Sequence, residues 1–401
     1  MITVRDFKLN LLFTIILLSA LVIQCFSFSL SFYDDLVDGG PIQIFLNYIY
    51  AFRDFCLFSS LGILLLYRAF PKDSIILISF VLIILLLSFA VHPENIKYFQ
   101  QVQTQFILCI DAYLIIRSNL VKIELLKKVL RMFCYGLSIL AIFTFFSQQS
   151  THLFMEKYMD YSNAVSIVSA LLLYFGLNEC KKIDTVLGFI TYIILFVAGG
   201  RGSFVTLTLL IVCLLWLKYN DKRLIYMAFS ICIVLLIFPN LILDIILGIS
   251  SSLDFESRTI ERLLSGDLLR GNDRYQLYSY LLGKIEDDYF LGGGICADRH
   301  YLNIGHLTDN GYYAHNIVIE LITDFGIFGI FLTIFIIRNI YIFIKKYHKN
   351  SEICGFIMVY FIVSFVQLFF SRSWLTEPNL FILMGLLIYY NNKNYEYQTK
   401  S

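Results

Sequence analysis

The chain has 401 residues, of which 58% are hydrophobic and 15% are charged, and its mean hydropathy is +0.74. Apolar runs of about 20 residues recur along the whole length, which excludes a soluble globular protein and predicts an all-α integral membrane protein. The formal net charge of +1 indicates no particular class of partner.

In chain order, we expect about twelve transmembrane helices and one large external loop between the ninth and the tenth. Residues 1–249 would hold helices 1–9, residues 250–313 the loop with an amphipathic helix, and residues 314–401 helices 10–12 and a short cytoplasmic tail. The predicted spans are 9–31, 42–67, 74–91, 101–116, 128–147, 162–177, 184–199, 203–217, 223–249, 314–344, 352–370 and 376–391.

Basic residues gather in alternate short connections, such as the one that holds Arg117, Lys122, Lys127, Lys128 and Arg131. By the positive-inside rule, these connections and both termini lie in the cytoplasm, and the loop at 250–313 lies outside. The first apolar run is too long for a signal peptide and is followed by no small-residue cleavage site, so we expect it to remain as an anchor.

Charged residues occur at two places inside or beside predicted spans, where a charge is unfavourable unless it is paired. Arg53 and Asp54 are neighbours within the second span, and a local pair is the simplest expectation, with a pair across helices or the lining of a cavity as alternatives. Arg201 lies in Ala198-Gly199-Gly200-Arg201-Gly202-Ser203, a tight external turn. Its planar guanidinium suits a phosphate, although a lone arginine at a helix end is often an interfacial anchor.

The large loop contains one predicted helix, from Asn272 to Asp288, with an apolar stripe that includes Leu277, Leu281 and Ile285. We expect this helix to lie on the membrane surface or to pack on the spans. Arg274 would leave the helix on its packing side, where it could hold a phosphate, a lipid headgroup or a capping carboxylate.

After this helix, Gly292-Gly293-Gly294 predicts a turn, since no Walker lysine follows to support a phosphate site. A polar and aromatic segment then leads to His315. Its mixture of side chains suits a surface that faces sugars and also fits a solvated loop: Asp298, Arg299, His300, Tyr301, His306, Asp309, Asn310, Tyr312 and Tyr313.

His315 lies where this hydrophilic segment enters an apolar helix, and a helix cap facing water is the alternative to a functional role. A neutral histidine is well matched to act as a base near pH 7. Glu320 or Asp324 could orient it, and Asn316 could form a local hydrogen bond with Glu320. No Cys or His spacing suggests a metal site, and only Cys296 of the nine cysteines falls in the large loop, so no disulfide framework is implied.

These motifs together resemble the O-antigen polymerase and ligase superfamily of bacterial envelope enzymes. The Gly-Gly-Arg-Gly-Ser turn resembles its first external arginine motif, and Arg274 with the helix after it resembles the second. The strongest similarity is the His-Asn-x-x-x-Glu-x-x-x-x-x-Gly-x-x-Gly block, formed here by His315, Asn316, Glu320, Gly326 and Gly329.

The resemblance implies a metal-independent glycosyltransferase of the bacterial inner membrane, without a cofactor, whose active site faces the periplasm. Its partners would be undecaprenyl-pyrophosphate-linked donor and acceptor glycans, membrane lipids and a chain-length regulator protein, and no nucleic acid. His315, Arg201 and Arg274 are the expected catalytic residues. The expected substrate-binding residues are Arg201, Arg274, Tyr312, Tyr313, Asn316 and Glu320.

Three functions fit this sequence. A polymerase would add the growing chain to a new lipid-linked repeat unit, and this is the preferred prediction because Gly-Gly-Arg-Gly and Tyr-x-His-Asn resemble polymerases more closely. A ligase would transfer the finished chain to lipid A-core. A lipid-linked oligosaccharide flippase is the alternative of a different class, but the two halves of the chain show no matching repeats.

Overall fold

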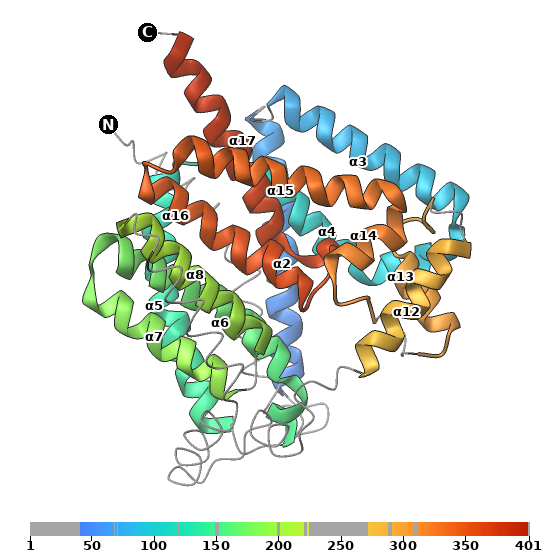
Figure 1. The fold of residues 1–401 in the computed structure, drawn as a ribbon, viewed down its shortest axis with the longest axis horizontal. Coiled ribbons are helices and arrows are strands. Elements are labelled where there is room, and N and C mark those ends of the chain that lie inside the picture. Colours follow the sequence, from blue (N-terminus) through green and yellow to red (C-terminus); the bar gives the residue numbers. More distant parts are fainter. Residues whose placement is uncertain are drawn as a thin grey trace. The chain divides into compact units, whose positions relative to one another are not determined.

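The computed structural model describes residues 41–399 except 68, 70, 119, 149–151, 199–200, 220–222, 224–271, 288–290 and 308–311. Within these residues every regular element is a helix (Figure 1). Seven helices in this part of the chain are long and apolar enough to cross a membrane: Asn47–Leu66, Lys72–Val91, Ile123–Ser147, Tyr161–Glu179, Gly202–Tyr219, Ile327–Tyr347 and Ser351–Phe369.

The all-α membrane class is therefore confirmed, while the total of twelve spans stays a prediction. The predicted spans at 9–31 and 223–249 lie outside the described residues. Those at 101–116, 184–199 and 376–391 form helices that are not among the seven, namely α4 (Ile96–Arg117), α7 (Lys182–Val197) and α17 (Pro378–Thr399).

The chain divides into two compact units. The first contains the beginning of α2 (Pro41–Leu66) and all of α5 (Ile123–Gln148), α6 (His152–Glu179), α7, α8 (Arg201–Tyr219) and α16 (Ser351–Tyr360). Helix α6 contacts the other four complete helices and is the most buried of the candidate spans. Small residues such as Ser166, Ser169 and Ala170 allow this close packing.

The charges inside α2 are paired with each other. Arg53 Nε lies 2.8 Å from Asp54 Oδ1, and the Arg53 guanidinium also lies over the Tyr50 ring at 5.3 Å. This is the local pair that the sequence favours. It reduces the cost of keeping two charges in an apolar helix.

The second unit contains the C-terminal part of the matched sequence motifs. Its helices are α3 (Lys72–Val91), α4, α12 (Asn272–Asp287), α13 (Ala297–Ile304), α14 (Ile317–Phe325), α15 (Ile327–Tyr347) and α17, with short 3-10 helices at Pro93–Asn95, Gln367–Phe369 and Trp374–Thr376. A π-helix, Phe361–Val366, continues α16.

Helix α12 confirms the helix predicted from Asn272. It packs against α13 and α14, and Figure 1 shows these three short helices gathered together. Leu281 of α12, Leu302 of α13 and Ala314 form their shared buried core. None of these three helices is a candidate span. The core therefore shows α12 packed against other short helices and not against the spans, which was one of the two expectations for it.

The span predicted at 314–344 is wrong, because the chain breaks inside it. Helix α14 has nine residues and ends at Gly326, whose φ of 58° is in the left-handed region. A new helix, α15, then begins at Ile327. The apolar composition is continuous across the break, so hydropathy alone could not locate it. The glycine supplies the conformation that ends α14.

Glycines bring the chain close to itself around this break. Gly292 and Gly294 both have φ of 83°, and the amides of Gly293 and Gly294 donate to Thr323 O (2.9 Å) and Asp324 O (3.0 Å) at the end of α14. The glycine run is thus the predicted turn, and these two amides are already used within the protein. A Cβ atom on Gly329 would overlap the Leu321 carbonyl oxygen.

We therefore expect Gly329→Ala to lower the thermal unfolding temperature of the detergent-solubilised protein by several degrees, because the close approach to Leu321 would be lost. Gly283→Ala on α12 is the matched control: a Cβ there meets no atom within 4 Å. It should leave stability unchanged or raise it by up to about 1 kcal/mol through helix propensity. Equal unfolding temperatures for the two variants would contradict the packing argument.

Candidate active site

The segment that carries His315 is irregular and runs from residue 312 to residue 316, directly before α14. The Asn316 side chain caps α14, accepting hydrogen bonds from the amides of Val318 (3.0 Å) and Ile319 (3.3 Å). Its own amide group donates to Phe369 O at 3.3 Å. The cap starts the helix after His315, whose φ of 54° is not helical. His315 therefore belongs to a connecting segment.

The His315 imidazole is held by aromatic rings and approached by positive charges. Its ring centroid lies 4.1 Å from that of Tyr313 and 5.7 Å from that of Tyr312. Burial, followed by the charges of Arg274 and Arg299, lowers the pKa of His315 to about 4. The Nδ1 atom is buried and has no hydrogen-bond partner among the residues that the structure describes. The imidazole is thus neutral at pH 7, as a general base requires.

Arg274 lies on the packing side of α12, as the sequence predicts. It is half-buried. Burial raises the pKa of Tyr278, while the charge of Arg274 and hydrogen bonds with Asn316 and Arg274 act in the opposite direction. Arg274, Tyr278 and Asn316 therefore lie together, and the charge of Arg274 acts on His315. Of the predicted site residues, the structure thus brings Arg274, His315 and Asn316 into one place.

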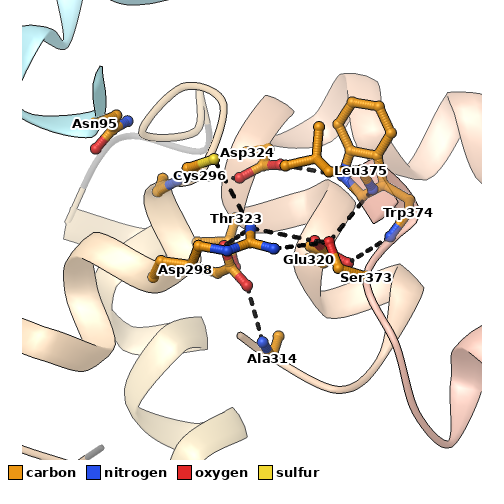
Figure 2. Close-up of polar contacts among 12 residues, drawn as sticks. Asn95, Cys296, Asp298, Ala314, Glu320, Thr323, Asp324, Ser373, Trp374 and Leu375 are labelled. Carbon is orange, nitrogen blue, oxygen red and sulfur yellow. Dashed lines mark hydrogen bonds and ion pairs between the residues drawn. The ribbon is translucent and has the colours of Figure 1, made fainter. Parts of the chain in front are cut away.

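Behind this segment lies a set of polar side chains that we call the buried ion cluster. It joins α13, α14 and the turn that follows residue 370, and consists of Asp298, Arg299, Glu320, Asp324, Ser373 and Trp374 (Figure 2). Asp298 and Glu320 are fully buried, and Arg299 is 2% exposed. Charges so deeply buried are tolerated only when they are paired and hydrogen-bonded.

Arg299 is the only cation in this cluster. Its Nη1 lies 3.4 Å from Asp298 Oδ1 and 3.6 Å from Glu320 Oε1, and its Nη2 donates to Ser373 Oγ at 2.9 Å. Ser373 in turn donates to Glu320. The guanidinium therefore connects an acid of α13 and an acid of α14 with a turn that is distant in sequence.

The remaining contacts attach backbone to carboxylates. Asp324 accepts from Ala297 N at 3.1 Å and from Trp374 Nε1 at 3.2 Å, and Glu320 accepts from Trp374 N at 3.2 Å. Asp298 accepts from Ala314 N at 2.8 Å. Figure 2 shows Glu320 and Asp324 reaching toward Ser373 and Trp374, and Asp298 reaching toward Ala314.

The cluster contains three carboxyl groups and one guanidinium, and this excess of acids shifts the pKa values of its members. Burial and then the charge of Asp298 raise the pKa of both Glu320 and Asp324. Burial by itself would lower the pKa of Arg299, but the surrounding negative groups raise it. The cluster thus keeps a permanent positive charge and favours retention of a proton by its acids.

Two predictions about this region are wrong. Asp298 and Arg299 do not belong to a solvated or sugar-facing surface, because both side chains are buried in the ion cluster. Glu320 is bonded to Ser373 and Trp374, whereas Asn316 caps its helix and bonds Phe369, so the expected local pair between them is replaced by longer-range contacts. Tyr312 is exposed, while Asp309 and Asn310 lie outside the described residues.

Arg201 is the first residue of α8 and belongs to the first compact unit, whereas Arg274 and His315 belong to the second. Its side chain, together with Gly199 and Gly200, lies outside what the structure describes. A shared site for Arg201 and His315 stays a prediction.

Sequence reasoning did not find Arg299, Ser373 and Trp374 as parts of the site. The available signal was weak: Ser371-Arg372-Ser373-Trp374 is a polar stretch between two predicted spans, and Asp298-Arg299 is an acid next to a base. Nothing in their spacing indicates that residues 298, 320 and 373 meet.

Comparison with known families supports the motif assignment. Residues 186–334 match the model of a family described as O-antigen ligase, and this stretch contains Arg201, Arg274, His315 and Glu320. The resemblance to the O-antigen polymerase and ligase superfamily is thereby confirmed. No curated protein and no solved structure matches the chain.

The buried ion cluster predicts a large stability loss when one partner is removed. Glu320→Ala should destabilise the protein by about 3–5 kcal/mol, because Arg299 loses part of its compensation. Glu320→Gln keeps an acceptor for Trp374 N and should cost less. Lys181→Ala is the control, since Lys181 Nζ and Glu179 lie 3.5 Å apart with side chains 56% and 45% exposed, and such surface pairs contribute about 1 kcal/mol or less. Thermal unfolding in detergent measures all three, and equal losses would refute the cluster's role.

Proposed function

We propose that this integral membrane protein is a surface-polysaccharide polymerase. The premise is that it is a glycosyltransferase-type enzyme of the O-antigen polymerase and ligase superfamily. It transfers the growing undecaprenyl-pyrophosphate-linked glycan to a new lipid-linked repeat unit at the periplasmic face of the inner membrane. The observation that carries the proposal is the His315 imidazole, packed 4.1 Å from the Tyr313 ring and acted on by the charges of Arg274 and Arg299, within the matched region.

In the proposed step, an acceptor sugar hydroxyl attacks the anomeric carbon of the donor glycan. The bond between that carbon and the pyrophosphate oxygen breaks, and undecaprenyl pyrophosphate leaves. His315 takes the hydroxyl proton, and one-step displacement inverts the anomeric centre. Arg274 and Arg201 stabilise the negative charge that develops on the departing pyrophosphate, so that the step uses no metal ion.

The electrostatics of the free site support this division of roles. Positive charge beside His315 favours an anion next to it, and it also keeps the imidazole unprotonated before the donor arrives. When the pyrophosphate binds, its negative charge offsets Arg274, and the imidazole becomes a stronger base at the moment when it is needed. The same guanidinium thus serves substrate binding and control of the base.

A ligase remains the second candidate, because the matched family is described as O-antigen ligase and both reactions require the same groups. The polymerase is preferred for the Gly-Gly-Arg-Gly turn and the Tyr313-Ala314-His315-Asn316 context. Deletion of the gene separates the two. A surface glycan with a single repeat unit on the core supports the polymerase, and a core with no repeat unit contradicts it. Purified protein that elongates lipid-linked repeat units in detergent excludes a flippase.

The catalytic assignment is tested most directly at His315. We expect His315→Asn to lower the rate of chain elongation by about 10²–10⁴-fold, because the proton acceptor is lost. Asparagine is the suitable replacement, since it tolerates the φ of 54° at this position. The rate of the purified variant on lipid-linked repeat units measures the effect. Wild-type elongation by this variant would remove His315 from the mechanism.

For the arginines, Arg274→Gln and Arg201→Gln should each lower the elongation rate by about 10²–10³-fold, since a donor to the developing charge disappears. Arg274→Lys should retain part of the rate because it keeps the charge but loses the fork. Lys284→Gln removes a positive charge from the same helix, α12, and is the matched control. An equal loss in Lys284→Gln would show that Arg274 acts only through net charge.

A further inference from the structure

We propose that Asp298 and Arg299 are positioning residues for the base: together they fix the segment of residues 313–315 and so hold the His315 imidazole in the orientation in which it accepts a proton. The inference rests on the proposed function for the reaction itself. It adds two residues of α13 that act through the connecting segment and that carry none of the matched motifs.

The first contact fixes the backbone. Asp298 Oδ2 accepts a hydrogen bond from Ala314 N at 2.8 Å, and both residues are fully buried. Ala314 immediately precedes His315, so this bond anchors the peptide unit from which the imidazole projects. A buried amide donor that lost its acceptor would be costly, which makes this attachment strongly preferred.

The second contact fixes the ring. The Arg299 guanidinium carbon lies 5.6 Å from the centre of the Tyr313 ring, in a cation–π arrangement. The Tyr313 ring lies in turn 4.1 Å from the His315 ring. Tyr313 is thus placed between the two, and a guanidinium in the buried ion cluster supports the tyrosine that supports the imidazole.

Arg299 is itself rigidly held, as a positioning residue must be. Its Nη2 donates to Ser373 Oγ at 2.9 Å, and its Nη1 faces Asp298 and Glu320. With 2% exposure it cannot exchange these partners for water. No carboxylate among the described residues bonds His315 Nδ1, so that within this part of the chain the imidazole is oriented by these indirect contacts.

The same groups determine the charge around the imidazole. Arg274 acts on it from α12, where Tyr278 lies beside Arg274. Asp298 and Arg299 adjoin its segment from α13, and Glu320 lies beyond Arg299 on α14. Tyr312 and Tyr313 flank the imidazole on its own segment. After burial, the charges of Arg274 and Arg299 lower the pKa of His315. Removing Arg299 should therefore raise that pKa.

The ring contact is tested by Tyr313→Leu, which leaves the buried ion cluster intact. We expect kcat for elongation to fall by about 10²-fold while KM for the lipid-linked donor changes less than about 3-fold, since a misplaced base slows chemistry without weakening binding. Tyr313→Phe retains the ring and should rescue most of this loss. A rise in KM with unchanged kcat would instead make Tyr313 a substrate contact and would overturn this part of the proposal.

The charged pair is tested by Arg299→Lys, Arg299→Met and Asp298→Asn. Arg299→Lys should keep more activity than Arg299→Met, and Asp298→Asn should keep the Ala314 bond and lose little. A readout independent of activity is carbethoxylation by diethyl pyrocarbonate, which modifies only the neutral imidazole and is followed residue by residue by mass spectrometry. His348 is exposed and serves as the internal control in the same sample.

In wild-type protein, the modification rate of His315 should fall only as the pH drops to about 4, and in Arg299→Met the midpoint should move upward. An unchanged midpoint in folded Arg299→Met would refute the electrostatic part of the proposal, and an unchanged kcat in Tyr313→Leu would refute the positioning role. If Arg299→Met does not fold, the Tyr313 variants decide. Absence of elongation by wild-type protein would refute the proposed function and leave the modification data valid.

Discussion

The architecture of the second unit depends on one buried cation. A guanidinium that is almost completely removed from water must be compensated. The compensation for Arg299 comes from its neighbour Asp298 and from two residues distant in sequence, Glu320 on α14 and Ser373 in the turn before α17. Because leaving such a charge unpaired is very unfavourable, these elements are held in one arrangement. The position of the His315 segment follows from it.

This constraint explains how an irregular connection can hold the imidazole that we propose as the base. His315 lies in an irregular segment, where side chains are ordinarily mobile, yet its neighbours are attached on both sides: Ala314 to Asp298, and Asn316 to the start of α14. The aromatic contact with Tyr313 completes the support. Burial, and then the charges of Arg274 and Arg299, lower the pKa of the imidazole and favour its neutral form, as the proposed general base requires.

The sequence by itself determined the fold class and the family resemblance. Long apolar runs can be stable only in a membrane, so composition was sufficient to predict transmembrane helices. The helix beginning at Asn272 followed from the spacing of Leu281 and Ile285, and the pairing of Arg53 with Asp54 followed from the cost of burying charge. The family motif around His315 followed from residue order, and the match of residues 186–334 confirmed it.

Only the tertiary structure decided which apolar residues form a span and which polar residues are buried. Hydropathy joined residues 314–344 into one helix, because it does not detect that Gly326 adopts a left-handed conformation and divides them. It also assigned Asp298 and Arg299 to a solvated loop, because local composition contains no information about Glu320 and Ser373 as distant partners. Charge compensation between segments far apart in sequence is a property of the folded chain, and the support of His315 by α13 became visible only there.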